Sequence, residues 1–384
     1  MGCDPLLGAR GSLGSTATGR FGVGGEALSA QVRSAPGRLT AIDLFCGAGG
    51  LSVGLRQAGF EVLGAIEISE LAARTYKLNH PKTAVWQRNI RSLSPLVVME
   101  TLGLEAGDLD LLAACPPCQG FSSMRTLRRT TSVEDKRNSL VAQFGRYAEA
   151  LRPKALMLEN VPGLASDVRF ERLQKRLRRL GYELSSDVLD AADYGVPQRR
   201  RRLVMIGMLG RSVPFARPTA ATQTVRDAIG SLLPPPIGDD PLHTHGEKRS
   251  LVVQRRIAAI PRDGGSLRDA GEEHTLDCRR RLKGFTDVYG RMAWNSPAPT
   301  ITSGCVNPSK GRFLHPSDNR AITLREAALL QTFPKSYRFP LDKGKFRVAD
   351  LIGNALPPKF VAAHARQLAR ALRVEPQPLP RASP

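Results

Sequence analysis

The first half of the chain alternates short apolar runs with longer amphipathic segments. Residues 39–45 (LTAIDLF), 61–67 (EVLGAIE) and 155–160 (ALMLEN) have the length and composition of buried strands. The segments 47–60 and 69–80 instead repeat apolar residues at the spacing of an amphipathic helix. Strands that alternate with helices predict βαβ units, so we expect an α/β fold with a mostly parallel sheet and helices on both faces.

The same alternation continues for another hundred residues. Further strands are expected at 109–115 and 201–209, and further helices at 139–153 and 170–182. The last of these helices is basic as well as amphipathic. These elements extend the predicted sheet and its two helical layers.

The pattern changes in the second half of the chain. Residues 213–300 are rich in Pro, Gly and Arg and have only weakly periodic segments, so we expect a second, irregular, basic domain there. A helix returns at 323–333, where Thr323 and Glu326 have the spacing of a capping box. A final helix is expected over 357–372, behind two prolines.

The composition of the chain indicates the kind of partner it binds and the compartment in which it is found. The chain has 56 Lys and Arg against 35 Asp and Glu, a formal net charge of +21. Such a balance favours nucleic acid as a partner over a merely solvated basic surface. No apolar run reaches the ~18 residues that a membrane span needs. Six cysteines form no dense framework and no secretory signal precedes them, so we expect reduced thiols, no membrane association and a cytoplasmic location.

A glycine-rich turn stands between the first strand and the first helix. In residues 43–50 (DLFCGAGG), glycines let the backbone approach a ligand at a helix N-terminus. Glu67 follows Gly47 by 20 residues and ends the second strand, where a carboxylate can hold both hydroxyls of a ribose. Ser52 replaces the third glycine of G-x-G-x-x-G. The turn therefore fits any nucleoside cofactor, NAD included, or a tight turn beside a solvated glutamate.

A C-x-x-C segment, residues 115–122 (CPPCQGFS), follows a predicted strand at the sheet edge where such folds bind ligands. A redox pair normally opens a helix, whereas the Pro–Pro pair and Gly120 favour a rigid loop. A zinc site needs a second pair of ligands, and the other cysteines are isolated, so we expect no metal. A single nucleophilic thiol is favoured, with Cys115 buried and inert.

Six ordered motifs connect these features to one family. They are DLFCGAGGLS (43–52), PPCQGFS (116–122), ENV (159–161), QRRRR (198–202), PAPTIT (297–302) and GNALPP (353–358). Over residues 39–372 the chain resembles the bacterial DNA cytosine-5 methyltransferases. The resemblance implies the Rossmann-like fold of S-adenosylmethionine-dependent methyltransferases, with a smaller target-recognition domain. It also implies a monomer that acts on double-stranded DNA and is associated with the nucleoid through that DNA.

The resemblance assigns the reacting groups. Cys118 would add to C6 of a cytosine flipped out of the duplex, because only a thiolate is both nucleophilic enough and able to leave afterwards. Pro117 would shape the pocket around the base. Glu159 would serve N3 of the ring, Arg202 would hold O2, and Arg200 would organise the nucleophile loop and a nearby phosphate.

The resemblance also implies S-adenosylmethionine as cofactor and S-adenosylhomocysteine as its product. The residues expected at the cofactor are Asp43, Phe45, Gly47, Gly49, Gly50, Glu67, Asn89, Ile90, Pro117 and Asn354. Where the family usually has Asp-Ile, this chain has Asn89 and Ile90. An asparagine oxygen can still accept a hydrogen bond from the adenine amine.

The motifs imply a domain division. We expect a disordered leader at 1–38, a catalytic and cofactor-binding domain at 39–212, and a target-recognition region with a hinge at 213–345. A return to the catalytic domain at 346–372 and a disordered tail at 373–384 complete the chain. Basic residues of the recognition region that could contact DNA are Arg255, Arg256, Arg279, Arg280 and Arg281.

Three other functions remain open from sequence. A tRNA cytosine-5 methyltransferase would carry a Cys-Phe-Thr signature, but the nearest string, at 284–286, begins with glycine. A catalytically inactive DNA-binding relative is disfavoured because Cys118, Glu159 and Arg202 are all present. An NAD-linked oxidoreductase would use the glycine turn to bind nicotinamide dinucleotide.

Overall fold

The computed structural model describes residues 37–117, 140–244, 247–274 and 287–374, all within one compact unit. The expected nucleophile, Cys118, lies outside these residues, as do Arg279, Arg280 and Arg281. None of the helices in the described ranges is long and apolar enough to cross a lipid bilayer.

A seven-stranded sheet organises the first half of the chain, in the order β3-β2-β1-β4-β5-β7-β6. The strands are β1 (Leu39–Leu44), β2 (Phe60–Glu67), β3 (Ala84–Gln87), β4 (Leu111–Ala114), β5 (Ala155–Asn160), β6 (Tyr182–Asp190) and β7 (Arg201–Leu209). The first five are parallel, and β7 is antiparallel to both β5 and β6. The predicted mostly parallel α/β fold is therefore confirmed.

The chain changes direction across the sheet between β1 and β4. From β1 it moves outward to β2 and β3, then returns to place β4 on the other side of β1. Adjacent crossovers on opposite faces leave a crevice beyond the carboxyl ends of the two strands, where ligands bind in such sheets. The glycine turn follows β1 and the C-P-P segment follows β4, so both open into this crevice.

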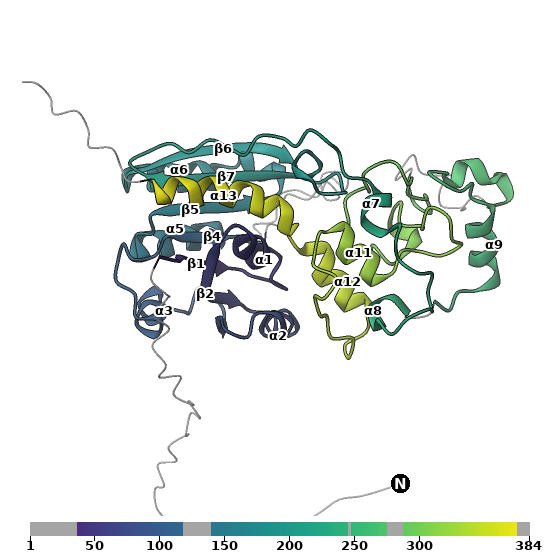
Figure 1. Ribbon diagram of the computed structural model, residues 1–384, viewed down its shortest axis with the longest axis horizontal. Helices are drawn as coiled ribbons and strands as arrows, with labels where there is room; N and C mark the ends of the chain where they lie inside the picture. The colour runs from purple at the N-terminus through teal and green to yellow at the C-terminus, as the bar shows by residue number, and fades with distance from the viewer. Residues whose placement is uncertain (1–36, 118–139, 245–246, 275–286, 375–384) are drawn as a thin grey trace, which may run out of the picture. The chain divides into compact units, whose positions relative to one another are not determined.

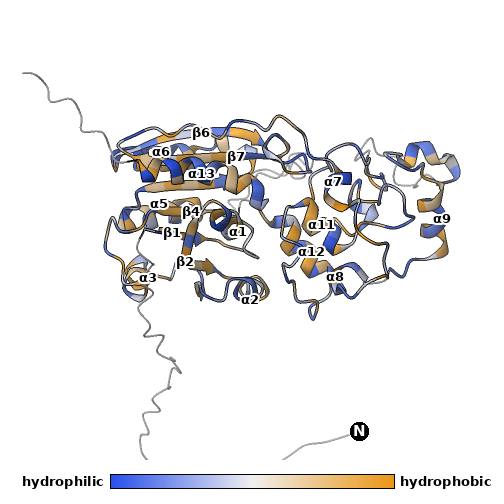
Figure 2. Cartoon of the chain, viewed as in Figure 1, coloured by the Kyte–Doolittle hydropathy of each residue, from blue (hydrophilic) through white to orange (hydrophobic). Residues whose placement is uncertain are grey.

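Helices cover both faces of the sheet. On one face pack α3 (Pro95–Leu102), α5 (Val141–Leu151) and α6 (Val168–Arg179), and on the other α1 (Gly50–Gln57) and α13 (Pro358–Arg373). Figure 1 shows α13 running along the sheet beside α1 although about 300 residues separate them. In Figure 2 the strands are mostly in the hydrophobic colours, whereas α6 and α13 mix both, as one-sided burial requires.

Three sheet-lobe elements were not placed from the sequence pattern: strand β3, helix α3 and strand β6. The helix predicted to reach Tyr182 ends at Arg179, because Tyr182 already begins β6. β6 is an edge strand that pairs only with β7, and most of its side chains are partly or fully exposed. Its sequence, YELSSDVLD, therefore lacks the apolar run by which buried strands are found.

The second lobe, defined here as residues 225–354, is built from short helices and loops. Its helices are α7 (Val225–Ile229), α8 (Pro241–Thr244), α9 (Leu251–Ala259), α11 (Leu324–Leu330) and α12 (Lys345–Asn354). The expected capping box is present at the start of α11. α12 packs in the apolar core of this lobe, whereas the following α13 packs on the sheet. The domain boundaries themselves stay a prediction.

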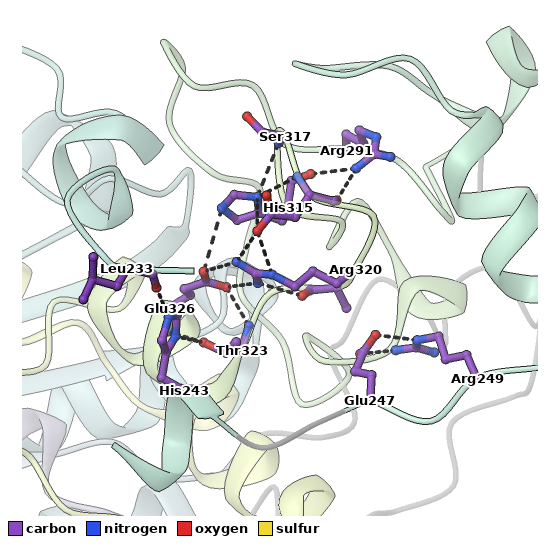
Figure 3. Close-up of polar contacts among 12 residues, drawn as sticks. Leu233, His243, Glu247, Arg249, Arg291, His315, Ser317, Arg320, Thr323 and Glu326 are labelled. Carbon is purple, nitrogen blue, oxygen red and sulfur yellow. Dashed lines mark hydrogen bonds and ion pairs between the residues drawn. The ribbon is translucent and has the colours of Figure 1, made fainter. Parts of the chain in front are cut away.

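A cluster of ion pairs and hydrogen bonds surrounds the buried Glu326 at the start of α11 (Figure 3). Glu326, 1% exposed, receives two hydrogen bonds of 2.8 Å from Arg320 and one of 2.7 Å from the Thr323 backbone. His315 lies 3.8 Å from the same carboxylate, and its Nδ1 accepts from the backbone of Asp318 at 3.0 Å. These contacts join the helix start of α11 to the loop that precedes it.

Arg291 ties α9 to the same loop. It is fully buried, and its guanidinium donates to the carbonyls of Ile257 and Ile260, at the C-terminal end of α9. It also donates to the His315 carbonyl at 3.0 Å. Carbonyls at a helix end have no partner within the helix, so a buried arginine can satisfy them and orient the helix at once.

Replacing Glu326 with Gln should destabilise the second lobe by about 3 kcal/mol at pH 7, because Arg320 would lose its buried counter-charge. Burial is the largest single influence and raises the pKa of Glu326, but the hydrogen bonds and positive charge of Arg320, together with His315 and the Thr323 backbone, hold the pKa below its ordinary value. The stabilisation is therefore present above about pH 4.3 and is lost as pH falls through the lower folded-state pKa. Urea unfolding of both proteins between pH 3 and pH 8 measures this difference.

The matched control is Glu171→Gln. Glu171 forms an exposed ion pair of 2.6 Å with Lys175 on α6. Water and salt screen such a pair, so its loss should not shift the urea midpoint measurably. A Glu326→Gln protein as stable as the wild type would contradict the assigned role of the buried cluster.

Candidate active site

A cleft of about 1200 Å³ opens at the carboxyl ends of β1, β2, β4 and β5, and second-lobe residues 300–303 and 350–354 complete its wall. The predicted site residues that line it are Phe45, Gly47, Gly50, Glu67, Asn89, Ile90, Pro117, Glu159, Arg200, Arg202 and Asn354. The tertiary structure thus gathers most of the described residues that were predicted for the site around one space.

The glycine turn is joined to the end of β2 by Glu67. The Gly47 amide donates to one carboxylate oxygen of Glu67 at 2.9 Å, and the amides of Ile68 and Ser69 donate to the other at 2.9 and 2.7 Å. Gly47 has φ +54°, and no described atom lies within 4 Å of the position of a Cβ there. The turn therefore offers open backbone to a ligand beside a fixed carboxylate.

Two predicted cofactor residues lie behind the wall of the cleft. Asp43 is fully buried and accepts a hydrogen bond of 2.6 Å from Ser52, whose hydroxyl also lies 2.7 Å from that of Tyr76. Burial raises the pKa of Asp43 to about 8, although the Ser52 hydrogen bond opposes the shift. Gly49 precedes α1 with φ +99°. Both residues support the turn and are not among those that face the cleft.

Asn89 and Ile90 also line the cleft. The Asn89 side chain is exposed, and its Oδ1 accepts from the Arg91 backbone at 3.1 Å. One further lone pair of this oxygen can accept a hydrogen bond from a ligand. Ile90 is buried, and Arg146 donates to its carbonyl oxygen.

Glu159 and Arg202 form an ion pair within the cleft, with 2.9 Å between Oε1 and Nε. β5 and β7 pair antiparallel, with Asn160 opposite Leu203, so the carboxyl end of one strand meets the start of the other. This register places the acid and the arginine side by side. Asn160 also donates to the Pro116 carbonyl at 2.9 Å, which holds the beginning of the C-P-P segment.

Cys115 differs from the expectation of a fully buried thiol. It follows β4, whose last residue pairs with Leu158 in parallel register, so Cys115 lies beside Glu159 and lines the cleft. Desolvation raises its pKa well above the ordinary thiol value, and the neighbouring carboxylates of Glu159 and Asp43 add to the shift. Burial is the main cause of this shift and the carboxylates add to it, which supports the low reactivity expected of this thiol.

Buried and exposed side chains alternate along the QRRRR motif. Arg200 is 4% exposed, whereas the flanking Arg199 and Arg201 are exposed. The Arg200 terminal nitrogens donate to the carbonyls of Ile301 and Gly353 at 2.9 and 3.0 Å. Burial, with a smaller contribution from Arg202, lowers its pKa to about 9. Arg200 therefore joins β7 to two second-lobe motifs. Its predicted contact with the nucleophile loop would involve residues outside the described ranges.

Gln198 and Gln331 extend this junction. Gln198 accepts from the Ile301 amide at 2.7 Å and donates to Gln331 at 2.8 Å. Gln331 in turn donates to the carbonyls of Ile352 and Ala355, on either side of Asn354. Sequence reasoning missed Gln331. The sequence did offer one indication: Gln331 is polar but stands seven positions after Leu324, on the apolar face of the predicted helix, where a buried hydrogen-bonding role can be suspected.

The chain is similar to known proteins over most of its length. The family model for C-5 cytosine-specific DNA methylases matches residues 39–370. The Type II methylase M.HgiDII of Herpetosiphon aurantiacus is 36% identical over 346 residues, which cover 86% of this chain and 95% of that protein. The Type II methyltransferase M1.HphI of Haemophilus parahaemolyticus is 35% identical over 334 residues, or 85% of this chain and 86% of that one.

Among solved structures, a candidate DNA modification methyltransferase encoded within an E. coli prophage has a TM-score of 0.67. It is 26% identical, and the alignment covers 88% of this chain and 100% of that chain. Both the family model and the curated relatives span the sheet lobe and the second lobe together. This chain therefore belongs to the family of C-5 cytosine-specific DNA methylases.

Proposed function

We propose that the protein transfers a methyl group from S-adenosylmethionine to C5 of a cytosine flipped out of double-stranded DNA, and that it does so as a monomer. The observation that carries this proposal is the single cleft that holds both the Glu67 turn and the Glu159–Arg202 pair. A methyl donor bound at the turn and a base held by the pair would face each other across that space.

The described residues fit the cofactor. Glu67 presents a fixed carboxylate suited to ribose hydroxyls, and Gly47 leaves open backbone beside it. Asn89 keeps a lone pair for an adenine amine, and Asn354 lines the same cleft from the second lobe. When bound, S-adenosylmethionine would supply an electrophilic sulfonium methyl group. The chain's own residues would orient the cofactor and exclude water from it.

The chemistry on the base follows from the residue types. The Cys118 thiolate would add to C6, forming an S–C6 bond and moving the C5–C6 electron pair onto C5, which makes C5 nucleophilic. The cofactor, when bound, would supply the methyl group to C5 and leave as S-adenosylhomocysteine as its sulfonium–methyl bond breaks. Loss of the C5 proton and expulsion of the thiolate would restore the aromatic ring. Glu159 and Arg202, held 2.9 Å apart, would hydrogen-bond the adjacent N3 and O2 of cytosine, where charge develops during addition.

The second lobe would hold the DNA. Arg255 is exposed on α9 and remains a candidate for a phosphate contact. Arg256 is less suited, because it donates to the His274 carbonyl at 3.0 Å and lies over the Tyr289 ring. The Type II names of the relatives support a role in restriction and modification, in which this enzyme would mark the recognition sequence of a companion nuclease.

The direct test supplies radiolabelled S-adenosylmethionine with unmethylated duplex DNA in one reaction and tRNA in another. We expect label in DNA, and bisulfite sequencing should place it at cytosine C5 in a fixed sequence context. Label confined to tRNA would replace the proposed substrate. Label in neither, together with a thermal shift produced by NAD alone, would favour the oxidoreductase alternative.

Substitution of the two cysteines separates their roles. Cys118→Ser should lower methyl transfer by at least about a thousandfold, because the nucleophile of a multistep reaction is lost. Cys115→Ala should retain transfer, since its thiol is held protonated beside Glu159. Initial rates on duplex DNA measure both. A folded Cys115→Ala protein as inactive as Cys118→Ser would mean that the loop has been misinterpreted.

Glu159→Gln should lower kcat by about a hundredfold or more, the contribution expected of a group that assists proton transfer to the ring. The KM for S-adenosylmethionine should change little, because Glu159 is placed at the base and not at the ribose. Glu67→Gln is the complementary variant and should raise that KM instead, by about tenfold or more. If both variants change the same kinetic parameter, the division of the cleft into base and cofactor halves is wrong.

A further inference from the structure

The glycine turn has a second anchor, which comes from the second lobe. Tyr337 lies in the loop between α11 and α12 and is 4% exposed. Its hydroxyl donates to the carbonyl oxygen of Ala48, the central residue of the turn. His80 lies on the other side of this hydroxyl, with Nε2 3.1 Å from Oη. A residue almost 290 positions away in sequence thus contacts the backbone of the turn.

The direction of each hydrogen bond is determined by chemistry. The Ala48 carbonyl can only accept, so the Tyr337 hydroxyl uses its proton there and its oxygen must accept from Nε2–H of His80. His80 Nδ1 has no hydrogen-bond partner among the described residues. Burial lowers the pKa of His80 to about 3, so the imidazole is neutral and the chain of two hydrogen bonds persists across the working pH range.

Apolar packing reinforces the same contact. Ala48 belongs to the apolar core of the second lobe together with Phe333 and Tyr337, whose ring centroids lie 4.7 Å apart. A Cβ added to Gly49 would lie 2.5 Å from the Tyr337 hydroxyl, so the tyrosine or the turn would have to move, and the φ of +99° at Gly49 is itself unfavourable for other residues. The turn is therefore shaped around this tyrosine, and glycine is required at the point of closest approach.

The Tyr337 loop is itself held on the sheet lobe. The side chain of Asn79, at the end of α2 (Glu70–Asn79), both donates to the Arg338 carbonyl at 2.8 Å and accepts from the Arg338 amide at 2.9 Å. Arg325 of α11 donates to the Tyr337 carbonyl at 3.0 Å. Contacts on both sides keep the phenol in one position, so it can transmit the placement of the second lobe to the turn.

We propose that Tyr337 is a positioning residue for the cofactor, one that makes the affinity of the glycine turn for S-adenosylmethionine depend on the placement of the second lobe. The turn is held at Gly47 by Glu67 and at Ala48 by Tyr337, so removing one anchor frees half of the ligand-facing backbone. The inference rests on the proposed function only in taking S-adenosylmethionine as the ligand.

The test is Tyr337→Phe in the full chain, which removes one oxygen and keeps the ring in the core. Isothermal titration with S-adenosylhomocysteine should give a Kd about three- to tenfold higher than that of the wild type, the range expected for one lost hydrogen bond. In steady-state assays the KM for S-adenosylmethionine should rise by a similar factor. The kcat at saturating cofactor should change by less than about twofold, because Tyr337 does not line the cleft.

Tyr182→Phe is the matched control. Tyr182 is also buried and donates its hydroxyl to a backbone carbonyl, that of Pro153, on β6 away from the cleft. Its loss should lower the melting temperature to a similar extent and leave the Kd for S-adenosylhomocysteine unchanged. If Tyr182→Phe weakens binding as much as Tyr337→Phe, the effect is a general loss of stability and the assignment is overturned.

His80→Gln provides an independent check, since glutamine retains an N–H donor for Oη. Its Kd should lie between those of the wild type and Tyr337→Phe. If the wild type binds S-adenosylhomocysteine and Tyr337→Phe binds it equally well, this inference alone is overturned. A wild type with no affinity for S-adenosylhomocysteine would overturn the proposed function and this inference with it.

Discussion

Arg200 donates from both terminal nitrogens to second-lobe carbonyls, those of Ile301 and Gly353, while only 4% of its surface is exposed. A buried guanidinium costs several kcal/mol in lost hydration, and this is tolerated only where fixed acceptors replace the water. Here the two carbonyls do so, and the carboxylate of Glu159 favours the charged form. Because the acceptors come from two separate motifs, satisfying Arg200 requires the second lobe to close one side of the cleft.

The other contacts at the junction depend on the same placement. Gln198 accepts a hydrogen bond from the amide of Ile301, and Arg200 donates one to its carbonyl. Both backbone polar groups of Ile301 are therefore fixed by the residues just before β7. Gln331 continues the chain of hydrogen bonds to the end of α12, beside Asn354. These donors and acceptors are buried, and an unmet one would cost about 1–3 kcal/mol. A shift of the second lobe would leave several of these groups unpaired at once, which favours one arrangement of the cleft.

This arrangement explains how distant motifs meet at one site. The parallel strands bring the glycine turn, the C-P-P segment and Glu159 to a common edge, and the antiparallel β7 returns Arg202 to that edge from the opposite direction. The second lobe then adds Asn354 and the residues from 300 to 303. The proposed cofactor and base regions consequently share a wall, and Tyr337 contacts the turn from the second lobe, which is proposed to hold the DNA.

The amino-acid sequence alone determined the α/β class, the strands that are buried on both faces, the capping box of α11 and the membership of one family. Those features depend on local periodicity and on motif order, which can be recognised in the amino-acid sequence without the fold. It did not reveal the edge strand β6, because exposure on one side removes the apolar run. Nor could it show that Asp43 stands behind the cleft, that Cys115 faces into it, or that Arg200 and Gln331 join the lobes. Those outcomes depend on which groups are neighbours after folding, and hydrogen bonds between residues more than 100 positions apart leave no periodic trace in the chain.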